Sequence, residues 1–152
     1  MSIFKKIAFL GGGNMAEALI KGMLSAEVAT SRQMVVTDTS PARLKYLKKY
    51  NINTAKNNHE AVQKAEIVLL CVKPQVMDAV LAEIASAADS KKLIISIAAG
   101  VTLSRIETAL IAGPRVIRVM PNTPALVGAS ASAFACGKGA TREDTMLVQK
   151  LL

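Results

Sequence analysis

Short apolar segments rich in β-branched residues alternate along the chain with longer segments in which apolar residues recur at helical spacing. The apolar segments predict strands at 6–10, 34–37, 53–54, 67–72, 93–97, 116–119 and 131–136. The fourth and fifth of these are apolar at consecutive positions, which is typical of parallel strands buried on both faces. The alternation predicts an α/β fold, with a doubly wound and mostly parallel sheet that carries helices on both faces.

Capping signals mark the starts of several intervening helices. Apolar residues at helical spacing predict helices over 15–24 and 76–85. Ser40 places a capping hydroxyl before Pro41, which suits the first helical position, and Thr102 is expected to cap another short helix. No repeat, low-complexity stretch or Pro/Gly/Ser-rich linker interrupts this order, so the chain is expected to form one domain.

The last predicted helix follows a capping box at 141–144. Its apolar stripe consists of Leu147, Val148, Leu151 and Leu152. The chain ends inside this helix with neither a glycine stop nor a C-terminal cap, so Leu151 and Leu152 are expected to remain exposed. We therefore expect the 152 residues to be one domain of a longer protein.

The composition favours a folded protein in the cytoplasm. Hydrophobic residues make up 51% and charged residues 20% of the chain, which excludes a disordered or fibrous protein. No apolar segment approaches the roughly 20 residues of a membrane span, and no signal-peptide cleavage site follows the first apolar segment. Cys71 and Cys136 lie in apolar segments and are expected to be reduced core residues, and the lack of C-x-x-C spacing argues against a metal site.

The net charge is the unusual quantity. The 19 Lys and Arg residues exceed the 11 Asp and Glu residues, and the net charge of +8 favours an anionic partner: nucleic acid, a membrane surface or a phosphorylated small molecule. Aromatic residues make up 3% and Trp is absent, so the stacking surfaces of single-strand binders are missing. We expect no nucleic-acid or membrane partner. A phosphorylated small molecule is the leading hypothesis, and a basic nucleic-acid-binding module at 43–56 is a remote alternative.

A glycine-rich segment at 11–16 lies directly after the first strand and opens the first helix. It has the G-x-G-x-x-G/A pattern of a Rossmann-type dinucleotide site. In that pattern Gly11 makes the tight turn, Gly13 lets the pyrophosphate approach the backbone, and Ala16 lets the helix pack on the strand. The pyrophosphate is then expected at the amino terminus of the helix, where the helix dipole favours an anion.

The choice between the two nicotinamide cofactors stays open in the sequence. Asp38 stands at the end of the second strand, where an acid hydrogen-bonds the adenosine ribose of NAD. Thr39, Ser40 and Arg43 follow, and their hydroxyls and guanidinium could instead hold the 2′-phosphate of NADP.

Three further strands are followed by polar or small turn residues. Lys73 would direct its charge toward the ribose or the substrate, and small Ala98 and Ala99 would let a flat nicotinamide ring approach the backbone. Asn122, between two prolines, offers an amide to the carboxamide or the substrate. Since ligands of open α/β sheets bind outside the carboxyl ends of the strands, these residues are expected to surround one crevice.

Four segments, in order and with matching spacing, resemble the amino-terminal half of pyrroline-5-carboxylate reductase. They are 9–16, 72–75, 96–102 and 120–125. Members of that family reduce Δ1-pyrroline-5-carboxylate to L-proline with NADPH or NADH, which is the last step of proline biosynthesis. The resemblance implies an oxidoreductase whose amino-terminal half binds the cofactor.

The resemblance also implies roles for individual residues. The pyrophosphate would lie on Leu10, Gly11, Gly12, Gly13, Asn14 and Met15. Ser40 would meet the phosphate or ribose on the adenosine side, and Asn58 would also contact the nucleotide. Val72, Lys73 and Ala99 would flank the nicotinamide ribose and ring.

Two departures from the family limit what the resemblance implies. Relatives often have an arginine just after the second strand, where this chain has Thr39, so NADPH and NADH both remain candidates. The helical carboxyl-terminal domain that carries the substrate loop and builds the dimer is missing. We therefore expect residues 1–152 to be the dinucleotide-binding domain, inactive alone, of a homo-oligomeric enzyme, with no catalytic residue assigned in it. The alternative is a β-hydroxyacid or prephenate dehydrogenase.

Overall fold

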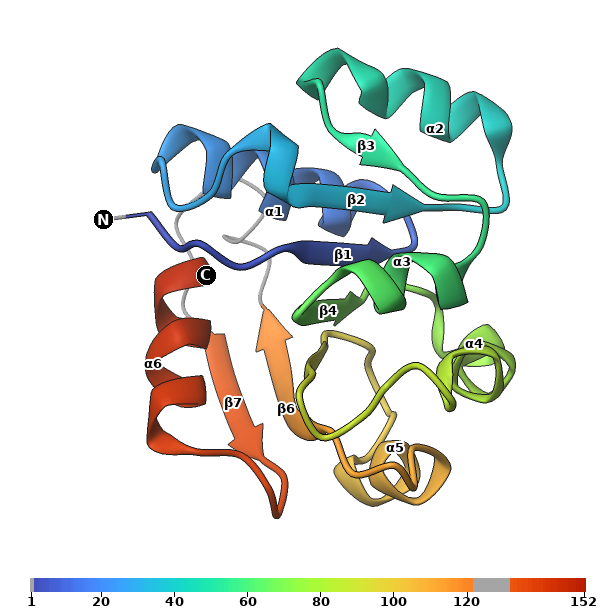
Figure 1. Ribbon diagram of the computed structural model, residues 1–152, viewed down its shortest axis with the longest axis vertical. Helices are drawn as coiled ribbons and strands as arrows, with labels where there is room; N and C mark the ends of the chain where they lie inside the picture. The colour runs from blue at the N-terminus through green and yellow to red at the C-terminus, as the bar shows by residue number, and fades with distance from the viewer. Residues whose placement is uncertain (1, 122–131) are drawn as a thin grey trace.

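One sheet runs through the middle of the molecule (Figure 1). The computed structural model describes residues 2–121 and 132–152, and within them the strand order is β3-β2-β1-β4-β5-β6-β7. The strands are β1 (Ile7–Leu10), β2 (Met34–Thr37), β3 (Asn53–Thr54), β4 (Ile67–Leu70), β5 (Leu93–Ser96), β6 (Arg115–Pro121) and β7 (Ser132–Cys136). The strands from β3 to β6 in this order are parallel to their neighbours, and β7 is antiparallel to β6.

Each predicted strand is present among the described residues, although several ends differ. β4 stops at Leu70, because its pairing with both neighbours ends there, opposite Leu10 of β1 and Ser96 of β5. β6 is longer at both ends than predicted, because Arg115 pairs with Leu93 of β5 at its start and β7 pairs with it as far as Pro121 at its end.

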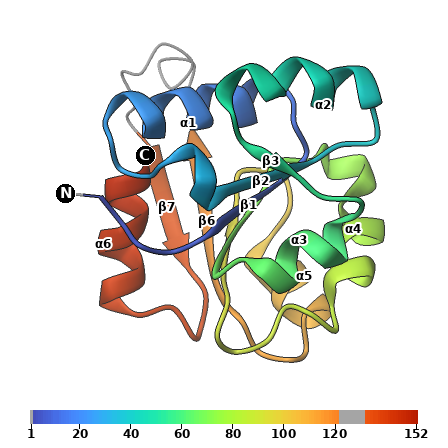
Figure 2. The same cartoon turned by 45° about the horizontal axis from the view of Figure 1, so that its top comes forward.

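Helices cover both faces of the sheet (Figure 2). One face carries α1 (Asn14–Ser25), α2 (Pro41–Leu47) and α6 (Arg142–Leu151), and the other carries α3 (Asn58–Lys64), α4 (Met77–Ile84) and α5 (Leu103–Ala109). Successive residues of a strand point to opposite faces, so each strand contributes to two apolar cores. Phe9 lies in the core under α1, whereas Leu10 lies in the core under α4. This architecture confirms the predicted fold, which is of Rossmann type.

Side-chain caps hold the starts of the helices as the sequence predicts. The hydroxyl of Ser40 accepts a hydrogen bond from the backbone of Arg43 at 3.2 Å. The hydroxyl of Thr102 accepts one from the backbone of Arg105 at 3.1 Å. The capping box at 141–144 is also present, with the reciprocal bonds at 3.1 and 2.9 Å. These local signals therefore position α2, α5 and α6 correctly.

Three burial predictions are wrong or incomplete. Leu151 is only 5% exposed and Leu152 packs against the same core, because α6 lies along the sheet face that α1 also covers. Cys136 is exposed, because β7 is an edge strand. Cys71 is partly buried as a free thiol, and burial raises its pKa to about 12. Of the helices in the described part of the chain, none is long and apolar enough to cross a membrane.

Candidate functional site

A cleft of about 960 Å³ opens at the carboxyl ends of β1, β2 and β4. Its lining residues are Gly13, Thr37, Asp38, Thr39, Lys56, Asn57, Asn58, Cys71, Val72, Lys73, Val76, Ala79, Val80 and Glu83. β1 pairs with both β2 and β4, so the chain winds outward in opposite directions from this point. Ligands of doubly wound sheets bind at such a topological switch point.

The three glycines after β1 differ in their surroundings. Gly11 has a φ of +96°, and a Cβ added to it would lie 2.8 Å from the carbonyl oxygen of Cys71. A Cβ on Gly12 would lie 2.8 Å from the Leu47 side chain. A Cβ on Gly13 would meet no atom within 4 Å, and this residue lines the cleft. The fold therefore requires a glycine at position 11, whereas a Cβ on Gly12 would displace the end of the Leu47 side chain and Gly13 leaves open space at the start of α1.

The peptide groups of Gly12 are held from both sides. One carboxylate oxygen of Asp38 accepts the N–H of Gly12 at 2.8 Å, and the other accepts the N–H of Ser40 at 2.8 Å. Arg43 donates from Nε to the carbonyl oxygen of Gly12. The carboxylate and the guanidinium that the sequence offers to the cofactor are thus engaged within the chain, where they brace the glycine-rich loop.

Glu17 on α1 holds Arg43 in this position. Its carboxylate accepts hydrogen bonds from Arg43 at 2.7 Å, Tyr50 at 2.6 Å and Tyr46 at 3.2 Å. Hydrogen bonds from Tyr50 and Arg43 outweigh the effect of burial and lower the pKa of Glu17 to about 2. Lys49 lies 3.4 Å from the same carboxylate and 3.7 Å from the centre of the Tyr46 ring. Glu17 is not among the predicted site residues, although the helical spacing of its partners Arg43, Tyr46 and Tyr50 was an available signal.

Asn58 is fixed on the opposite side of the cleft. Its side-chain oxygen accepts the hydroxyl of Thr37 at 2.5 Å. Its backbone and side-chain N–H groups donate to the carboxylate of Glu83 at 3.0 and 2.9 Å. Glu83 comes from α4 and carried no sequence signal, because its position beside Asn58 arises only from the packing of α3 on α4.

The remaining predicted residues near β1 and β2 have different degrees of exposure. Leu10 is fully buried, and its carbonyl oxygen accepts the backbone N–H of Cys71 at 2.8 Å. Asn14 and Thr39 are exposed, and Met15 packs partly into the core. Of these residues, Thr39 lines the cleft.

The residues predicted after the later strands divide into three groups. Val72 and Lys73 line the cleft beyond β4. Ala98 is 4% exposed and belongs to the core, because its methyl group faces α4 and α5. Ala99 is exposed beyond β5 but does not line the cleft. Asn122 lies outside the described residues.

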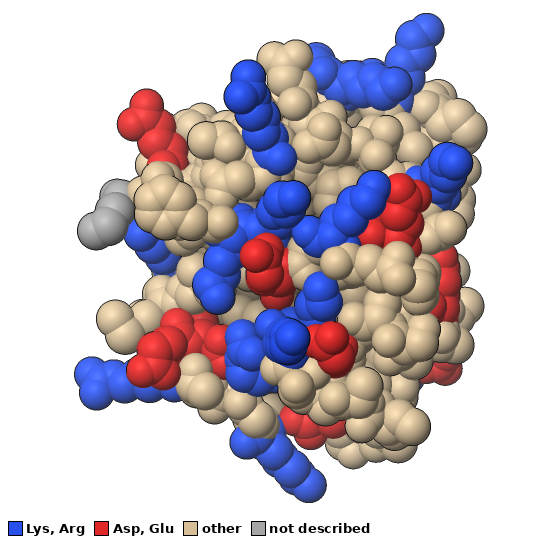
Figure 3. All heavy atoms as spheres, in the orientation of Figure 1, with Lys and Arg blue, Asp and Glu red and all other residues tan. Residues whose placement is uncertain are grey.

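Positive charge is spread widely over the surface. Figure 3 shows Lys and Arg side chains gathered over the part of this face that holds α2, with acidic side chains between basic ones elsewhere. The cleft lining contains Lys56 and Lys73 but also Asp38 and Glu83, so its formal charges balance and the net charge of +8 arises elsewhere on the molecule.

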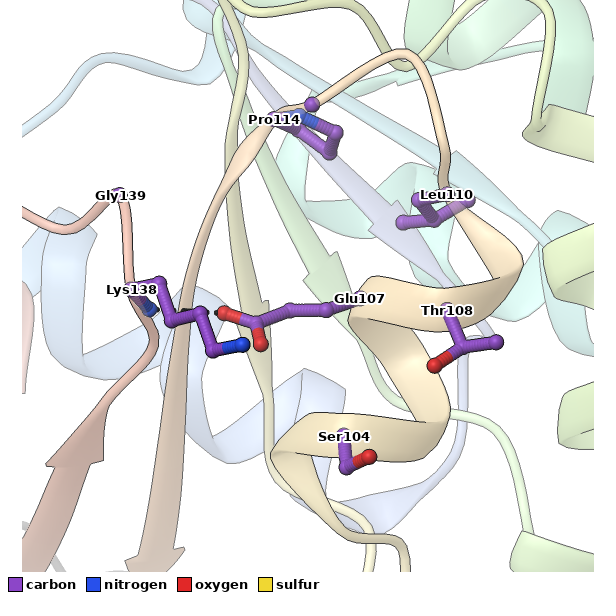
Figure 4. A pocket seen from close by; sticks show the side chains of 8 residues that line it. Ser104, Glu107, Thr108, Leu110, Pro114, Lys138 and Gly139 are labelled. Atoms are coloured by element: carbon purple, nitrogen blue, oxygen red, sulfur yellow. Dashed lines mark hydrogen bonds between the residues drawn. The ribbon is translucent and has the colours of Figure 1, made fainter.

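A second hollow of about 510 Å³ lies beside α5 (Figure 4). It is lined by Ser104, Glu107, Thr108, Leu110, Gly113, Pro114, Lys138 and Gly139. The side chain of Glu107 accepts the backbone N–H of Lys138 at 2.8 Å, which ties α5 to the turn after β7. None of the predicted site residues lines this hollow. Within residues 2–121 and 132–152, no cluster of His, Cys, Asp and Glu could hold a metal ion.

Similar sequences are found among oxidoreductases. A family model described as NADP oxidoreductase, coenzyme F420-dependent, matches residues 6–100. Pyrroline-5-carboxylate reductase of Methanosarcina acetivorans is 43% identical over 141 residues, which are 92% of this chain and 52% of that protein. Pyrroline-5-carboxylate reductase 3 of Rattus norvegicus is 36% identical over 152 residues, which are 100% of this chain and 56% of that protein. The chain spans about half the length of the curated relatives it matches.

Solved structures give the same result. A pyrroline-5-carboxylate reductase from Coxiella burnetii has a TM-score of 0.92 and 31% identity, over 98% of this chain and 56% of that chain. The Plasmodium falciparum enzyme, solved with NADP bound, has a TM-score of 0.87 and 27% identity, over 99% of this chain and 55% of that chain. These similarities confirm the resemblance that the four sequence motifs indicated.

Proposed function

The chain belongs to the family described as NADP oxidoreductase, coenzyme F420-dependent, and from that membership we propose that it is the dinucleotide-binding domain of a pyrroline-5-carboxylate reductase. The proposed reaction is the reduction of Δ1-pyrroline-5-carboxylate to L-proline with NADPH or NADH. When bound, the cofactor supplies the hydride that is added to the carbon of the C=N bond.

The uncapped start of α1 is the observation that carries the proposal. Side chains cap α2, α3, α5 and α6, and α4 continues directly from a 3-10 turn at Pro74–Val76, whereas α1 starts after a loop and Gly13 gives it no side-chain hydrogen bond. The first N–H groups of a helix need a partner, and a pyrophosphate is a suitable one. The open space at Gly13 fits such a ligand.

The residues of this chain bind and orient the cofactor. We assign the pyrophosphate to the loop from Leu10 to Met15, which Asp38 braces through Gly12. Ser40 and Asn58 lie toward the adenosine end, and Val72, Lys73 and Ala99 lie toward the nicotinamide end. No residue of this chain is assigned as an acid or a base.

The activity belongs to a protein of the relatives' length. We expect the 152-residue chain to bind the cofactor without measurable turnover. The longer protein would be a cytoplasmic homo-oligomer with a small-molecule substrate, and neither nucleic acid nor a membrane would be its partner.

Fluorescence titration of the purified chain with NADPH and NADH tests the cofactor site. We expect saturable binding, and the absence of binding at millimolar concentrations of both would overturn the assignment.

The substrate is tested by assaying a protein of the relatives' length with Δ1-pyrroline-5-carboxylate, a β-hydroxyacid and prephenate. Turnover of a hydroxyacid or prephenate without reduction of the imine would place the protein among the dehydrogenases instead.

A further inference from the structure

Acidic and basic side chains in the cleft differ in whether they already have partners. Asp38 accepts two backbone N–H groups, and Glu83 accepts both N–H groups of Asn58. Lys56 and Lys73 are exposed, and among the described residues neither ammonium group forms an ion pair. The two ammonium groups are therefore the charged groups of the lining that no hydrogen bond or ion pair within the described residues engages, and the carboxylate of Glu60 lies beside Lys56, where it accepts the backbone N–H of that lysine at 3.1 Å.

The sheet register places Lys56 beside Asp38. β3 pairs with β2 in parallel, with Thr54 opposite Val36. The backbone N–H of Ala55 still donates to the carbonyl of Val36 at 3.2 Å, so the two segments continue side by side past the paired residues. Since neighbouring strands lie about 4.8 Å apart, Lys56 stands next to the end of β2. That end is where a dinucleotide-binding fold receives the adenosine ribose.

The other groups near this point supply no free positive charge to a phosphate. Arg43 is engaged by Glu17 and by the carbonyl of Gly12. Thr39 and Ser40 offer neutral hydroxyl groups, and Lys73 follows β4 on the opposite side of the cleft. Asp38 does not project an unpartnered carboxylate toward the ribose, because both of its oxygens accept backbone N–H groups.

Resting on the proposed function, we propose that Lys56 binds the 2′-phosphate of NADPH and makes this cleft select NADPH over NADH. The ammonium group forms a charge-assisted contact with the phosphate that is absent from the complex with NADH.

The test measures dissociation constants of NADPH and NADH for the 152-residue chain and its variants by fluorescence titration. We expect the unaltered chain to prefer NADPH. Lys56→Gln is expected to reduce the ratio of NADPH to NADH affinity by about tenfold, and Lys56→Glu is expected to reduce it further. Lys56→Arg keeps the positive charge and is expected to keep the ratio of the unaltered chain. Lys48→Gln removes an exposed lysine that does not line the cleft, and it is expected to keep the ratio within about twofold.

Each alternative result has a distinct meaning. An unchanged ratio in Lys56→Gln, or equal affinity of the unaltered chain for both cofactors, overturns the role of Lys56 and leaves the proposed function in place. If the ratio of NADPH to NADH affinity falls in Arg43→Gln but not in Lys56→Gln, the 2′-phosphate is bound by Arg43, and this result also overturns the role of Lys56. Binding of neither cofactor by the unaltered chain overturns the proposed function itself. Thermal unfolding of every variant shows whether a loss of cofactor affinity is caused by a loss of folding.

Discussion

Gly13 is the residue at which the needs of the fold and of the ligand can be separated. A methyl group there enters open space, so Gly13→Ala is expected to change the free energy of unfolding by less than about 1 kcal/mol. The same methyl group occupies the space assigned to the pyrophosphate, so affinity for NADPH should fall by more than about tenfold. Urea unfolding and fluorescence titration measure the two effects.

Gly11→Ala is the matched control for Gly13→Ala, because it adds the same methyl group where the fold has no room for it. Its φ of +96° and the Cys71 oxygen 2.8 Å from the added Cβ are expected to cost roughly 1–3 kcal/mol of stability. If Gly13→Ala binds NADPH as tightly as the unaltered chain does, the pyrophosphate does not approach this glycine.

At the scale of elements, Glu17 joins α1 to α2. Its pKa lies at about 2 in the folded chain, below the ordinary value of 4.5, because Tyr50 and Arg43 donate to the ionised carboxylate. Its contribution to stability is therefore complete above about pH 4.5 and is lost as the pH falls toward 2. Glu17→Gln is expected to cost about 2 kcal/mol at pH 7, and the difference from the unaltered chain should shrink at pH 3 in urea unfolding.

Glu27→Gln serves as the control for this pH dependence, because it removes an exposed carboxylate outside the α1–α2 contact. It should leave stability within about 0.5 kcal/mol at both pH values. A pH-independent loss in Glu17→Gln would show that the carboxylate acts only by packing.

Asp144 joins α6 to the sheet in a comparable way. It is 5% exposed, accepts from Nε of Arg115 on β6 at 2.8 Å, and completes the capping box with Thr141 at 2.9 Å. Asp144→Ala removes the cap and leaves the guanidinium of Arg115 without its partner, so it is expected to cost about 2–4 kcal/mol in urea unfolding. Asp144→Asn retains an acceptor for the cap and should cost less. Equal losses in both variants would contradict the contribution of the cap and assign the whole effect to the charge on Asp144.

At the scale of the whole molecule, the net charge of +8 predicts a salt dependence of cofactor binding. A phosphate monoester carries about 1.5 to 2 negative charges at neutral pH, so NADPH senses the positive field more strongly than NADH. Raising NaCl from about 50 to about 500 mM should weaken NADPH binding several times more than NADH binding. Fluorescence titration at each salt concentration measures this, and equal weakening would show that the 2′-phosphate meets no free cation.

Much of the fold follows from local signals. Periodicity predicts the strands, and the hydroxyls of Ser40, Thr102 and Thr141 mark where helices begin. The glycine-rich segment predicts the turn that Gly11 makes. The burial of Leu151 could not be read in the same way, because it depends on where α6 packs rather than on its own pattern.

The sequence by itself determined the order of the elements, the glycine-rich loop and the similarity to pyrroline-5-carboxylate reductases, because these depend on residues close together in the chain. Only the tertiary structure decided which charges in the cleft are free. Asp38 and Arg43 have their polar groups engaged by Gly12, 26 and 31 residues away, and Lys56 reaches the end of β2 only through the pairing of β3 with β2. Such partners are set by sheet register and helix packing, which no local pattern encodes.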